Sequence, residues 1–492
     1  MRIAFVGQIL PTGGVLYDNV TPIGTILLAQ IARQRGHTVR QIVIRLDRKH
    51  DWRNDLREFQ PEVLCFTVFT RWFLKYAEIF AECRRLLPGC TLVLGGPHAS
   101  SVQEWTLEDS PELDFAVVAE GERAFEGLLD YWEGRTALTS IPNLIYRQGG
   151  KIVANRVGPE LTPAELDALP FPAYDLVPES DFRSRFGRKA MVIPSRGCYF
   201  RCKFCLPNFL GEKVRSHSPD YTVRLIRSLY DGYGVRFLMV GDALFPSSRH
   251  WLDDFLDRLE DERFRGLKWA CTTRVQYIDR AHYTRMKALG LVGVAVGVEA
   301  ADEVVLRDIR KGITLDGVRE TAQMLHEVGI PFITNFIVGH RLDTPESVGK
   351  ILPLVREVRP HFLNMNALIP TPGTPLFPLV PDNEKRYYTR QMTPPCINAG
   401  GFRRTAEEYT IFCQTTYMHY YGSFHYLWQN GIRWWLKEPG DYERFRAALL
   451  VVEFWLRARR QYAAGMLARY RTLRPGLRAL QKAFHLLAGV GR

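Results

Sequence analysis

Short apolar runs alternate with longer amphipathic stretches over residues 1–135. The runs have the length and composition of strands, and the stretches between them have helical spacing. This β-α alternation predicts a parallel, doubly wound, Rossmann-like sheet, whose ligands bind at the carboxyl ends of its strands. The expected strands are residues 2–7, 38–46, 63–67, 91–94 and 115–118, and the expected helices are residues 22–35 and 72–87.

A second alternation fills residues 190–377. Strands that follow one another with helices between them predict a partial (β/α)6 barrel, whose working groups gather where the strands end. The expected strands are residues 190–194, 237–240, 269–273, 292–298, 332–338 and 363–368, and helices are expected at residues 221–230 and 316–328.

The two alternating regions are joined by a stretch of different character. Residues 143–155 predict a hairpin that turns at Gly149-Gly150, and five prolines between positions 159 and 178 keep the following chain extended. Residues 378–492 are helix-rich and aromatic and carry no motif that can be interpreted. The expected domains are a first sheet at 1–135, a connector at 136–189, a barrel at 190–377 and a helical C-terminal domain at 378–492.

Composition places this chain among ordinary globular proteins. Its 492 residues allow two or three domains, and its hydrophobic content is 46%. The first residues have the pattern of a strand rather than of a signal peptide, and no apolar run approaches the roughly 20 residues of a spanning helix. Nine cysteines without paired spacing outside one motif predict a reducing, cytoplasmic location.

The net charge of +12 is unevenly distributed. No acidic residue follows Glu453, whereas nine Lys and Arg residues do. Arginines mixed with Leu, Phe and Trp are typical of amphipathic helices that lie on a membrane surface. This interpretation predicts peripheral membrane contact and a hydrophobic or lipid-like substrate. The alternative is that the arginines are solvated and that their helices pack on the barrel.

Three cysteines lie close together in a short loop after the first barrel strand. Cys198, Cys202 and Cys205 are spaced by four and three residues, and Gly197 precedes them. This spacing favours an iron–sulfur cluster or a zinc site over a disulfide, which needs pairs. Three thiolates can hold three irons of a four-iron cube and leave the fourth open. A zinc site completed by a distant ligand is the alternative.

The same loop resembles the signature of radical S-adenosylmethionine (SAM) enzymes, Cys-x-x-x-Cys-x-x-Cys with an aromatic, here Phe204, before the last cysteine. The resemblance implies that a 4Fe-4S cluster binds SAM at its open iron through the SAM amino and carboxylate groups. One electron, from a reductant such as flavodoxin or ferredoxin, would then split the sulfonium into methionine and a 5′-deoxyadenosyl radical.

Residues at the ends of later strands match further positions of this family. Gly241 and Asp242 lie where the family holds the SAM amino group, although many members have Gly-Gly-Glu there. Arg274, Glu299 and Gly339 match positions near the SAM carboxylate, ribose and adenine. A structural ion pair between Arg274 and Glu299 is the alternative.

Three loops of the first sheet resemble the cobalamin-binding domain of one large radical SAM subfamily. They are Thr67-x-x-Thr70, the turn that begins at Gly95, and Glu120-Gly121-Glu122. The Asp-x-His-x-x-Gly motif that supplies an axial histidine in other cobalamin proteins is absent from the sequence, so the lower face of cobalt is not expected to be ligated by that route. The resemblance implies cobalamin contacts from Thr67, Thr70, Gly95, Gly96, Pro97, His98, Glu120 and Gly121.

His98 is a candidate cobalt ligand, but a histidine at a helix start more often packs or forms a hydrogen bond. Arg71 and Thr70 are equally suitable neighbours of the lower face.

The resemblance implies a cobalamin-dependent radical SAM enzyme. The leading interpretation is a C-methyltransferase that abstracts hydrogen from an unactivated carbon of a small molecule and transfers methyl from methylcobalamin. A non-methylating relative, such as an oxidative cyclase or a ligation or rearrangement enzyme, is the alternative. An RNA methylthiotransferase is a third class, but its second compact three-cysteine cluster is missing here, so nucleic acid is not an expected partner.

Overall fold

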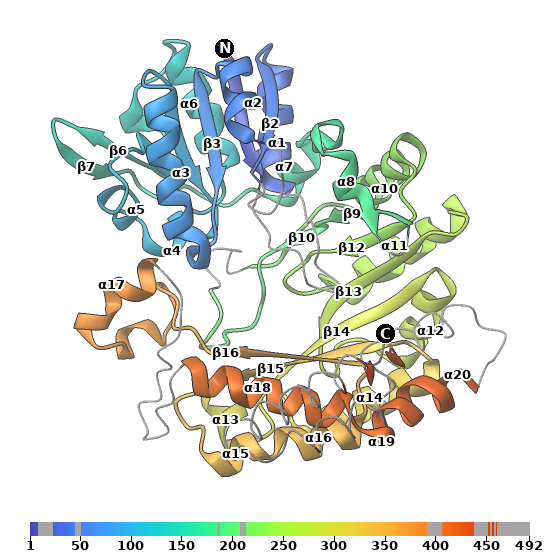
Figure 1. Cartoon of the computed structure of the whole chain (residues 1–492). Coiled ribbons are helices and arrows are strands. Elements are labelled where there is room, and N and C mark those ends of the chain that lie inside the picture. Colours follow the sequence, from blue (N-terminus) through green and yellow to red (C-terminus); the bar gives the residue numbers. More distant parts are fainter. Residues whose placement is uncertain are drawn as a thin grey trace, which may run out of the picture.

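The computed structural model describes residues 1–7, 23–44, 51–184, 187–206, 213–390 and 406–436, together with Val451, Val452, Trp455, Leu456 and Arg459. Two twisted sheets form the body of the molecule, one from the first 154 residues and one from the middle of the chain (Figure 1). Helices α18 to α20 (residues 406–436), orange-red to red in Figure 1, lie along the outer side of the second sheet, whereas α17 (Asp382–Arg390) lies next to the first sheet.

The first sheet has seven strands in the order β2-β1-β3-β4-β5-β6-β7. Its first five strands are parallel and confirm the predicted doubly wound fold. Leu64 and Phe66 of β3 pack on one face, and Val63 and Cys65 pack on the other, as the two-residue period of a strand requires. The strands are β1 (Arg2–Gly7), β2 (Thr38–Val43), β3 (Val63–Thr67), β4 (Thr91–Gly95) and β5 (Phe115–Val117), and the helices are α1 (Ile23–Gln34), α2 (Trp52–Phe59), α3 (Phe73–Leu86), α4 (Pro97–Val102), α5 (Trp105–Glu108) and α6 (Glu122–Trp132).

The hairpin predicted in the connector belongs to this first sheet. Strand β6 (Leu144–Gln148) pairs antiparallel with β5 and with β7 (Lys151–Ala154). Gly149 and Gly150 have φ of 57° and 78°, which the two-residue turn requires and glycine adopts without strain. The sheet therefore extends to Ala154, beyond the expected boundary at residue 135.

The second sheet has the order β16-β15-β14-β13-β12-β9-β8. Six of its strands are parallel and follow the chain order, so the sheet curls into a partial barrel with helices outside it, as predicted. The elements are β8 (Arg183–Ser184), β9 (Gly187–Val192), β12 (Phe237–Val240), β13 (Lys268–Arg274), β14 (Leu291–Glu299), β15 (Phe332–Val338) and β16 (Phe362–Ala367), with α10 (Pro219–Tyr233), α11 (Arg249–Glu262), α12 (Arg280–Ala288), α13 (Glu303–Asp308), α14 (Leu315–Val328), α15 (Pro345–Gly349) and α16 (Ile351–Val358).

The outer edge of β16 is covered by α18 (Ala406–Tyr421). The Tyr421 hydroxyl accepts a hydrogen bond from the Leu363 N–H at 2.5 Å and donates one to the Leu363 carbonyl at 3.0 Å. Tyr417 does the same at Met365, at 2.6 and 3.3 Å. These two side chains satisfy edge groups that an open barrel leaves exposed.

The remaining described helices of the C-terminal region are α17 (Asp382–Arg390), α19 (Phe424–Tyr426) and α20 (Arg433–Leu436). No helix in the described part of the chain is both long and apolar enough to cross a membrane. Apart from Arg459, the basic residues after Glu453 lie outside the described residues.

Candidate functional site

The cysteine loop begins directly after β10 (Ser195–Arg196), which pairs antiparallel with β11 (Arg215–Ser216). Cys198, Cys202 and Cys205 are free, and Cys202 is buried. The Cys205 amide donates to the Cys202 carbonyl at 3.1 Å. Burial, followed by the neighbouring Cys202 and Cys198, raises the pKa of the Cys205 thiol to about 11. Cys202 and Cys205 therefore share one turn, and Cys198 lies close enough to act on the Cys205 thiol.

These thiols do not converge on one point. Among the residues that the structure describes, no three His, Cys, Asp or Glu side chains are placed to hold a single metal ion. In a four-iron cube, each thiolate binds a different iron, so the cysteines need not converge in this way. Three free thiols in one short loop are the donor set that such a cube requires, and the loop fits it.

Asp242 follows β12 and is buried against β10. Its carboxylate accepts hydrogen bonds from the Ser195 amide at 2.9 Å and the Ser195 hydroxyl at 2.7 Å. Burial raises the pKa of Asp242 to about 7, and the Ser195 bonds only partly oppose this rise. At Gly241, a Cβ atom would lie 2.9 Å from the Met191 sulfur. Asp242 thus anchors the strand that leads into the cysteine loop, and its predicted contact with the SAM amino group stays a prediction.

Arg274, at the end of β13, lies beside the cysteine loop. Its guanidinium carbon is 3.6 Å from the centre of the Phe200 ring, and only 7% of the residue is exposed. Its Nη2 atom is buried and has no hydrogen-bond partner among the described residues. A buried N–H without a partner suits an anionic group. Arg274 therefore fits the predicted SAM carboxylate.

Glu299, at the end of β14, forms its ion pair with a residue that the sequence did not single out. Its carboxylate lies 2.7 Å from the Lys311 Nζ, and both side chains are buried. The alternative of an ion pair between Glu299 and Arg274 is therefore not what the structure has. Glu299 has φ of 73° at a break in the β14–β15 register, which turns its side chain back toward Lys311.

Gly339 follows β15 directly and has φ of 107°. The amides of Gly339 and His340 both donate to Asp343 Oδ2, at 2.8 and 2.9 Å. The His340 ring meets the edge of Phe204, with ring centres 6.1 Å apart. Phe204 thereby links the cysteine loop to the end of β15, next to the position predicted for adenine.

A cavity of about 310 Å³ lies between the first sheet and the start of the barrel. On the barrel side it is lined by Ser195, Arg196, His217 and Gly241. On the side of the first sheet its lining is largely apolar and includes Phe5, Leu27, Cys65, Val93 and Val117. The predicted cofactor residues that line it are Thr67, Gly95, Gly96, Glu120, Gly121 and Gly241.

Gly96 and Thr67, which both line this cavity, lie too close together for a side chain at position 96. Gly96 has φ of 88°, and a Cβ atom there would lie 2.3 Å from the Thr67 Oγ1. Glycine backbone and hydroxyl groups beside apolar side chains suit part of a large cofactor that has both amide and ring surfaces.

The structure places Thr70, Pro97 and His98 elsewhere, since they are not among the described residues that line the cavity. The His98 ring stacks on Phe73 at 3.9 Å, and its Nδ1 lies 3.2 Å from the Thr70 hydroxyl. Burial lowers the pKa of His98 to about 3, so the ring is neutral. Its packed position matches the interpretation of a packing residue.

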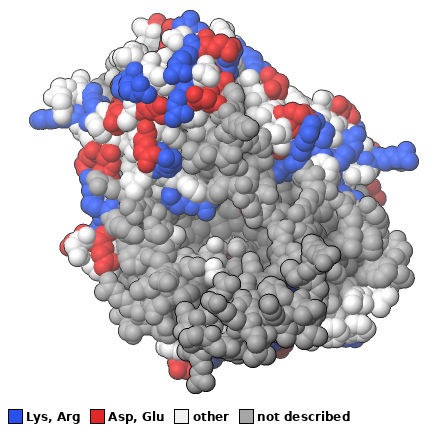
Figure 2. Space-filling model, viewed as in Figure 1, with Lys and Arg blue, Asp and Glu red and all other residues white. Residues whose placement is uncertain are grey.

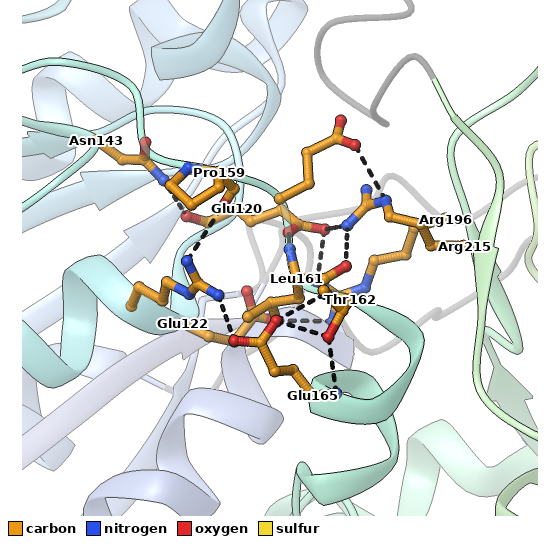
Figure 3. Close-up of polar contacts among 11 residues, drawn as sticks. Glu120, Glu122, Asn143, Pro159, Leu161, Thr162, Glu165, Arg196 and Arg215 are labelled. Carbon is orange, nitrogen blue, oxygen red and sulfur yellow. Dashed lines mark hydrogen bonds and ion pairs between the residues drawn. The ribbon is translucent and has the colours of Figure 1, made fainter.

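Glu120 and Glu122 form an ion-pair network with the barrel (Figure 3). Glu120 Oε1 lies 3.0 Å from Arg196 Nη1 and 2.9 Å from Arg215 Nη1, and Glu122 lies 2.7 Å from Arg196 Nη2. The second Glu120 oxygen accepts from the Leu161 amide at 2.8 Å. Burial opposes ionisation of Glu120, but Arg196 and Arg215 still hold its pKa below 4.5. The Glu120 carboxylate is thus already occupied by protein groups.

Four residues near these groups were not expected from the sequence: Arg196, Arg215, His217 and Lys311. His217 lines the cavity, stacks on Tyr221 at 4.1 Å and lies 3.4 Å from Asp167. Burial lowers the pKa of His217 to about 4. The sequence does hold one signal for the ion pairs of Arg196. A cation stands directly before Gly197 and the first cysteine, and two carboxylates stand close together in Glu120-Gly121-Glu122.

Two known families match this chain. The family described as "Radical SAM superfamily" matches residues 192–355. The family described as "B12 binding domain" matches residues 10–129. The first match contains the cysteine loop and the ends of β12 to β15, and the second contains the strand ends that border the cavity. Together they confirm the predicted cofactor set of a 4Fe-4S cluster, SAM and cobalamin.

Three relatives show the range of named activities. An uncharacterized methyltransferase of Pyrococcus horikoshii is 26% identical over 65% of this chain and 70% of its own length. The anaerobic magnesium-protoporphyrin IX monomethyl ester cyclase of Cereibacter sphaeroides is 25% identical over 87% of this chain and 72% of its own. The hopanoid C-3 methylase of Methylococcus capsulatus is 25% identical over 73% of this chain and 68% of its own.

Two solved structures share the fold. The radical SAM methyltransferase TsrM from Kitasatospora setae, with cobalamin and a 4Fe-4S cluster bound, has a TM-score of 0.64 at 19% identity and covers 76% of this chain and 73% of its own. The cobalamin-dependent radical SAM enzyme OxsB, with aqua-cobalamin bound, has a TM-score of 0.68 at 15% identity and covers 92% and 72%. Residues 192–355 of the chain thus carry a radical SAM domain, and residues 10–129 carry a B12 binding domain.

Proposed function

We propose that this radical SAM enzyme is a cobalamin-dependent C-methyltransferase that acts on an unactivated carbon of a small molecule. The observation that carries the proposal is the cavity in which strand ends of the B12 binding domain face β10 and Gly241 of the barrel. When bound, the cluster with SAM supplies a hydrogen-abstracting radical, and cobalamin supplies the methyl group. The protein's own task is then to place these groups and to exclude water.

The described residues divide this task. Cys198, Cys202 and Cys205 would hold three irons and leave one open for SAM. Arg274 would bind the SAM carboxylate through its Nη2, and Phe200 covers one face of the guanidinium and keeps it out of water. No Ser, His or Asp nucleophile is required, because the cofactors carry the bond-making chemistry.

Anaerobic reconstitution with iron, sulfide and hydroxocobalamin tests this proposal. We expect about four irons and one corrinoid per chain, 5′-deoxyadenosine after reduction, and labelled methyl from SAM in the product. Replacing Cys198, Cys202 and Cys205 together by Ala should abolish the iron and the nucleoside but leave corrinoid binding. Nucleoside formation without label in any product would contradict the methyl transfer and leave the radical chemistry standing.

A non-methylating reaction is the second candidate, as an oxidative cyclase or as a ligation or rearrangement enzyme. The observation that favours a cyclase is the alignment with the Cereibacter sphaeroides cyclase, which spans 87% of this chain. The labelling experiment separates the two, because a cyclase would consume SAM without transferring its methyl group.

The described surface does not favour an RNA methylthiotransferase. On the face in Figure 2, the described Lys and Arg residues are interspersed with Asp and Glu over the helices of the first sheet. A nucleic-acid-binding face commonly has a patch of one sign instead. The described C-terminal elements that follow the barrel are helices, among them α18, rather than the strands of a small RNA-binding barrel.

A hydrophobic or lipid-like substrate, met at a membrane surface in the cytoplasm, is the finer part of the proposal. The hopanoid C-3 methylase among the relatives and the basic residues after Glu453 support it. Co-sedimentation with anionic liposomes, with and without residues 454–492, tests the membrane contact, and equal sedimentation would end it. Flavodoxin and ferredoxin are the reductants to supply in these assays.

A further inference from the structure

The ion-pair network of Glu120, Glu122, Arg196 and Arg215, here called the clamp, joins the two cofactor-binding domains. Glu120 and Glu122 lie between β5 and the first turn of α6, in the B12 binding domain. Arg196 is the last residue of β10, and Gly197 and Cys198 follow it directly. Only one glycine therefore separates a clamp residue from a cluster cysteine.

The clamp is largely shielded from solvent, so its charges depend on one another. The side chains of Arg215 and Glu122 are 8% and 9% exposed, and those of Glu120 and Arg196 are 17% and 20% exposed. Breaking a buried ion pair from one side leaves a charge without compensation, which is strongly unfavourable. The clamp thus holds the contact between the B12 binding domain and the barrel more firmly than surface ion pairs would.

Register explains why the clamp acts on the cysteine loop. Arg196 and Arg215 are directly opposite each other in the β10–β11 pair. Two cations placed opposite each other across a strand pair repel, and Glu120 offsets this by binding both, while Glu122 takes the second Arg196 nitrogen (Figure 3). The start of the cysteine loop is therefore fixed by carboxylates from the other domain.

The same residues border the cavity assigned to cobalamin. Glu120, Gly121, Glu122 and Arg196 all line it, and Gly121 lies between the two carboxylates. We propose that the clamp positions the cysteine loop against the corrin cavity, so that loading the cluster tightens cobalamin binding through Arg196. Glu120 and Glu122 are then positioning residues for both cofactors rather than cobalamin contacts. The inference needs both cofactors but not methyl transfer, so the two proposals can fail separately.

Hydroxocobalamin titration, followed by absorbance, tests this coupling in cluster-free and cluster-loaded protein. In the wild type we expect the dissociation constant to fall about fivefold or more on cluster loading, the low end of usual coupling between sites. In Arg196→Gln the two constants should become equal. Arg196→Lys should be intermediate, because an ammonium cannot bond both carboxylates in the planar fork of a guanidinium.

Arg227→Gln is the control, since it removes a partly exposed ion pair between Arg227 of α10 and Glu262 of α11, within the barrel domain and away from the clamp. This variant should keep the wild-type ratio of the dissociation constants of cluster-free and cluster-loaded protein. The paired variant Arg196→Gln with Glu122→Gln removes both charges of this ion pair, so no buried charge is left without its partner. If Arg196→Gln alone does not fold, the paired variant takes its place. The paired variant should load iron normally and still lack the coupling.

Relaxation of the cob(II)alamin electron spin gives a second measure, because a nearby reduced cluster speeds it in a steeply distance-dependent way. With both cofactors bound, this enhancement should weaken in Arg196→Gln and not in Arg227→Gln. A wild-type ratio of one, or the wild-type ratio and relaxation retained in both Arg196→Gln and the paired variant, would overturn the proposal.

Discussion

Asp242→Asn removes a buried carboxylate whose pKa burial raises from 3.8 to about 7. The rise amounts to about 4 kcal/mol at about 1.4 kcal/mol per pH unit. Between about pH 4 and pH 7 the folded chain keeps this proton while the unfolded chain has released it, so the free energy of unfolding falls as the pH rises. Asparagine can keep both contacts to Ser195 without a charge.

Urea unfolding of the apo-protein, followed by tryptophan fluorescence at several pH values, measures this contribution. We expect Asp242→Asn to gain stability relative to the wild type as the pH rises, by about 3 kcal/mol between pH 5 and pH 8. Asp220→Asn, at the exposed start of α10, is the control and should follow the wild-type profile. Parallel profiles for the wild type and Asp242→Asn would refute the reasoning.

The same variant separates two roles of Asp242. A SAM ammonium beside the carboxylate would favour its ionised form. If Asp242 meets that group, Asp242→Asn should stabilise the apo-protein and weaken SAM binding together. If it only anchors β10 through Ser195, SAM affinity in cluster-loaded protein should change little.

Three further substitutions test contacts at the strand ends. Lys311→Met leaves the buried Glu299 carboxylate without its partner and should cost about 3–5 kcal/mol in urea unfolding, which Lys311→Met with Glu299→Met should largely restore. Gly297→Ala would place its Cβ 2.5 Å from Glu299 Oε1 and should cost about 1–3 kcal/mol, whereas Gly293→Ala on the same strand, with its nearest atom at 3.9 Å, should cost less. Gly96→Ala, at φ of 88°, should weaken hydroxocobalamin binding in titrations and leave iron content unchanged; equal binding would contradict a corrin in this cavity.

Local pattern was sufficient where an element is defined by its own residues. Strands β12 and β15 begin and end where the apolar runs predict. The ends of parallel strands share one edge of a sheet, so polar residues after separate strands could be expected to meet there. Together with the resemblance to a cobalamin-binding domain, this reasoning predicted one site for Gly95, Gly96 and Glu120, and all three line one cavity.

Contacts between distant segments could not be predicted in the same way. Ser195 and Asp242 are 47 residues apart, and Glu120 and Arg196 are 76 apart. Which carboxylate meets which cation depends on how the two domains pack, and the sequence does not encode that packing in any local period. The hairpin of β6 and β7 was assigned to the connector for a related reason, because its own residues do not say which edge it joins.

The phenols of Tyr417 and Tyr421 form the hydrogen bonds that a further strand beside β16 would otherwise form. Each phenol both accepts from and donates to the backbone of a single residue, at Leu363 and again two residues later at Met365. A chain cut before α18 would thus lose more than a helix. It would expose β16 as an edge strand with unpaired backbone N–H and C=O groups. Other copies of the chain could pair with this edge, so we expect the shortened chain to self-associate.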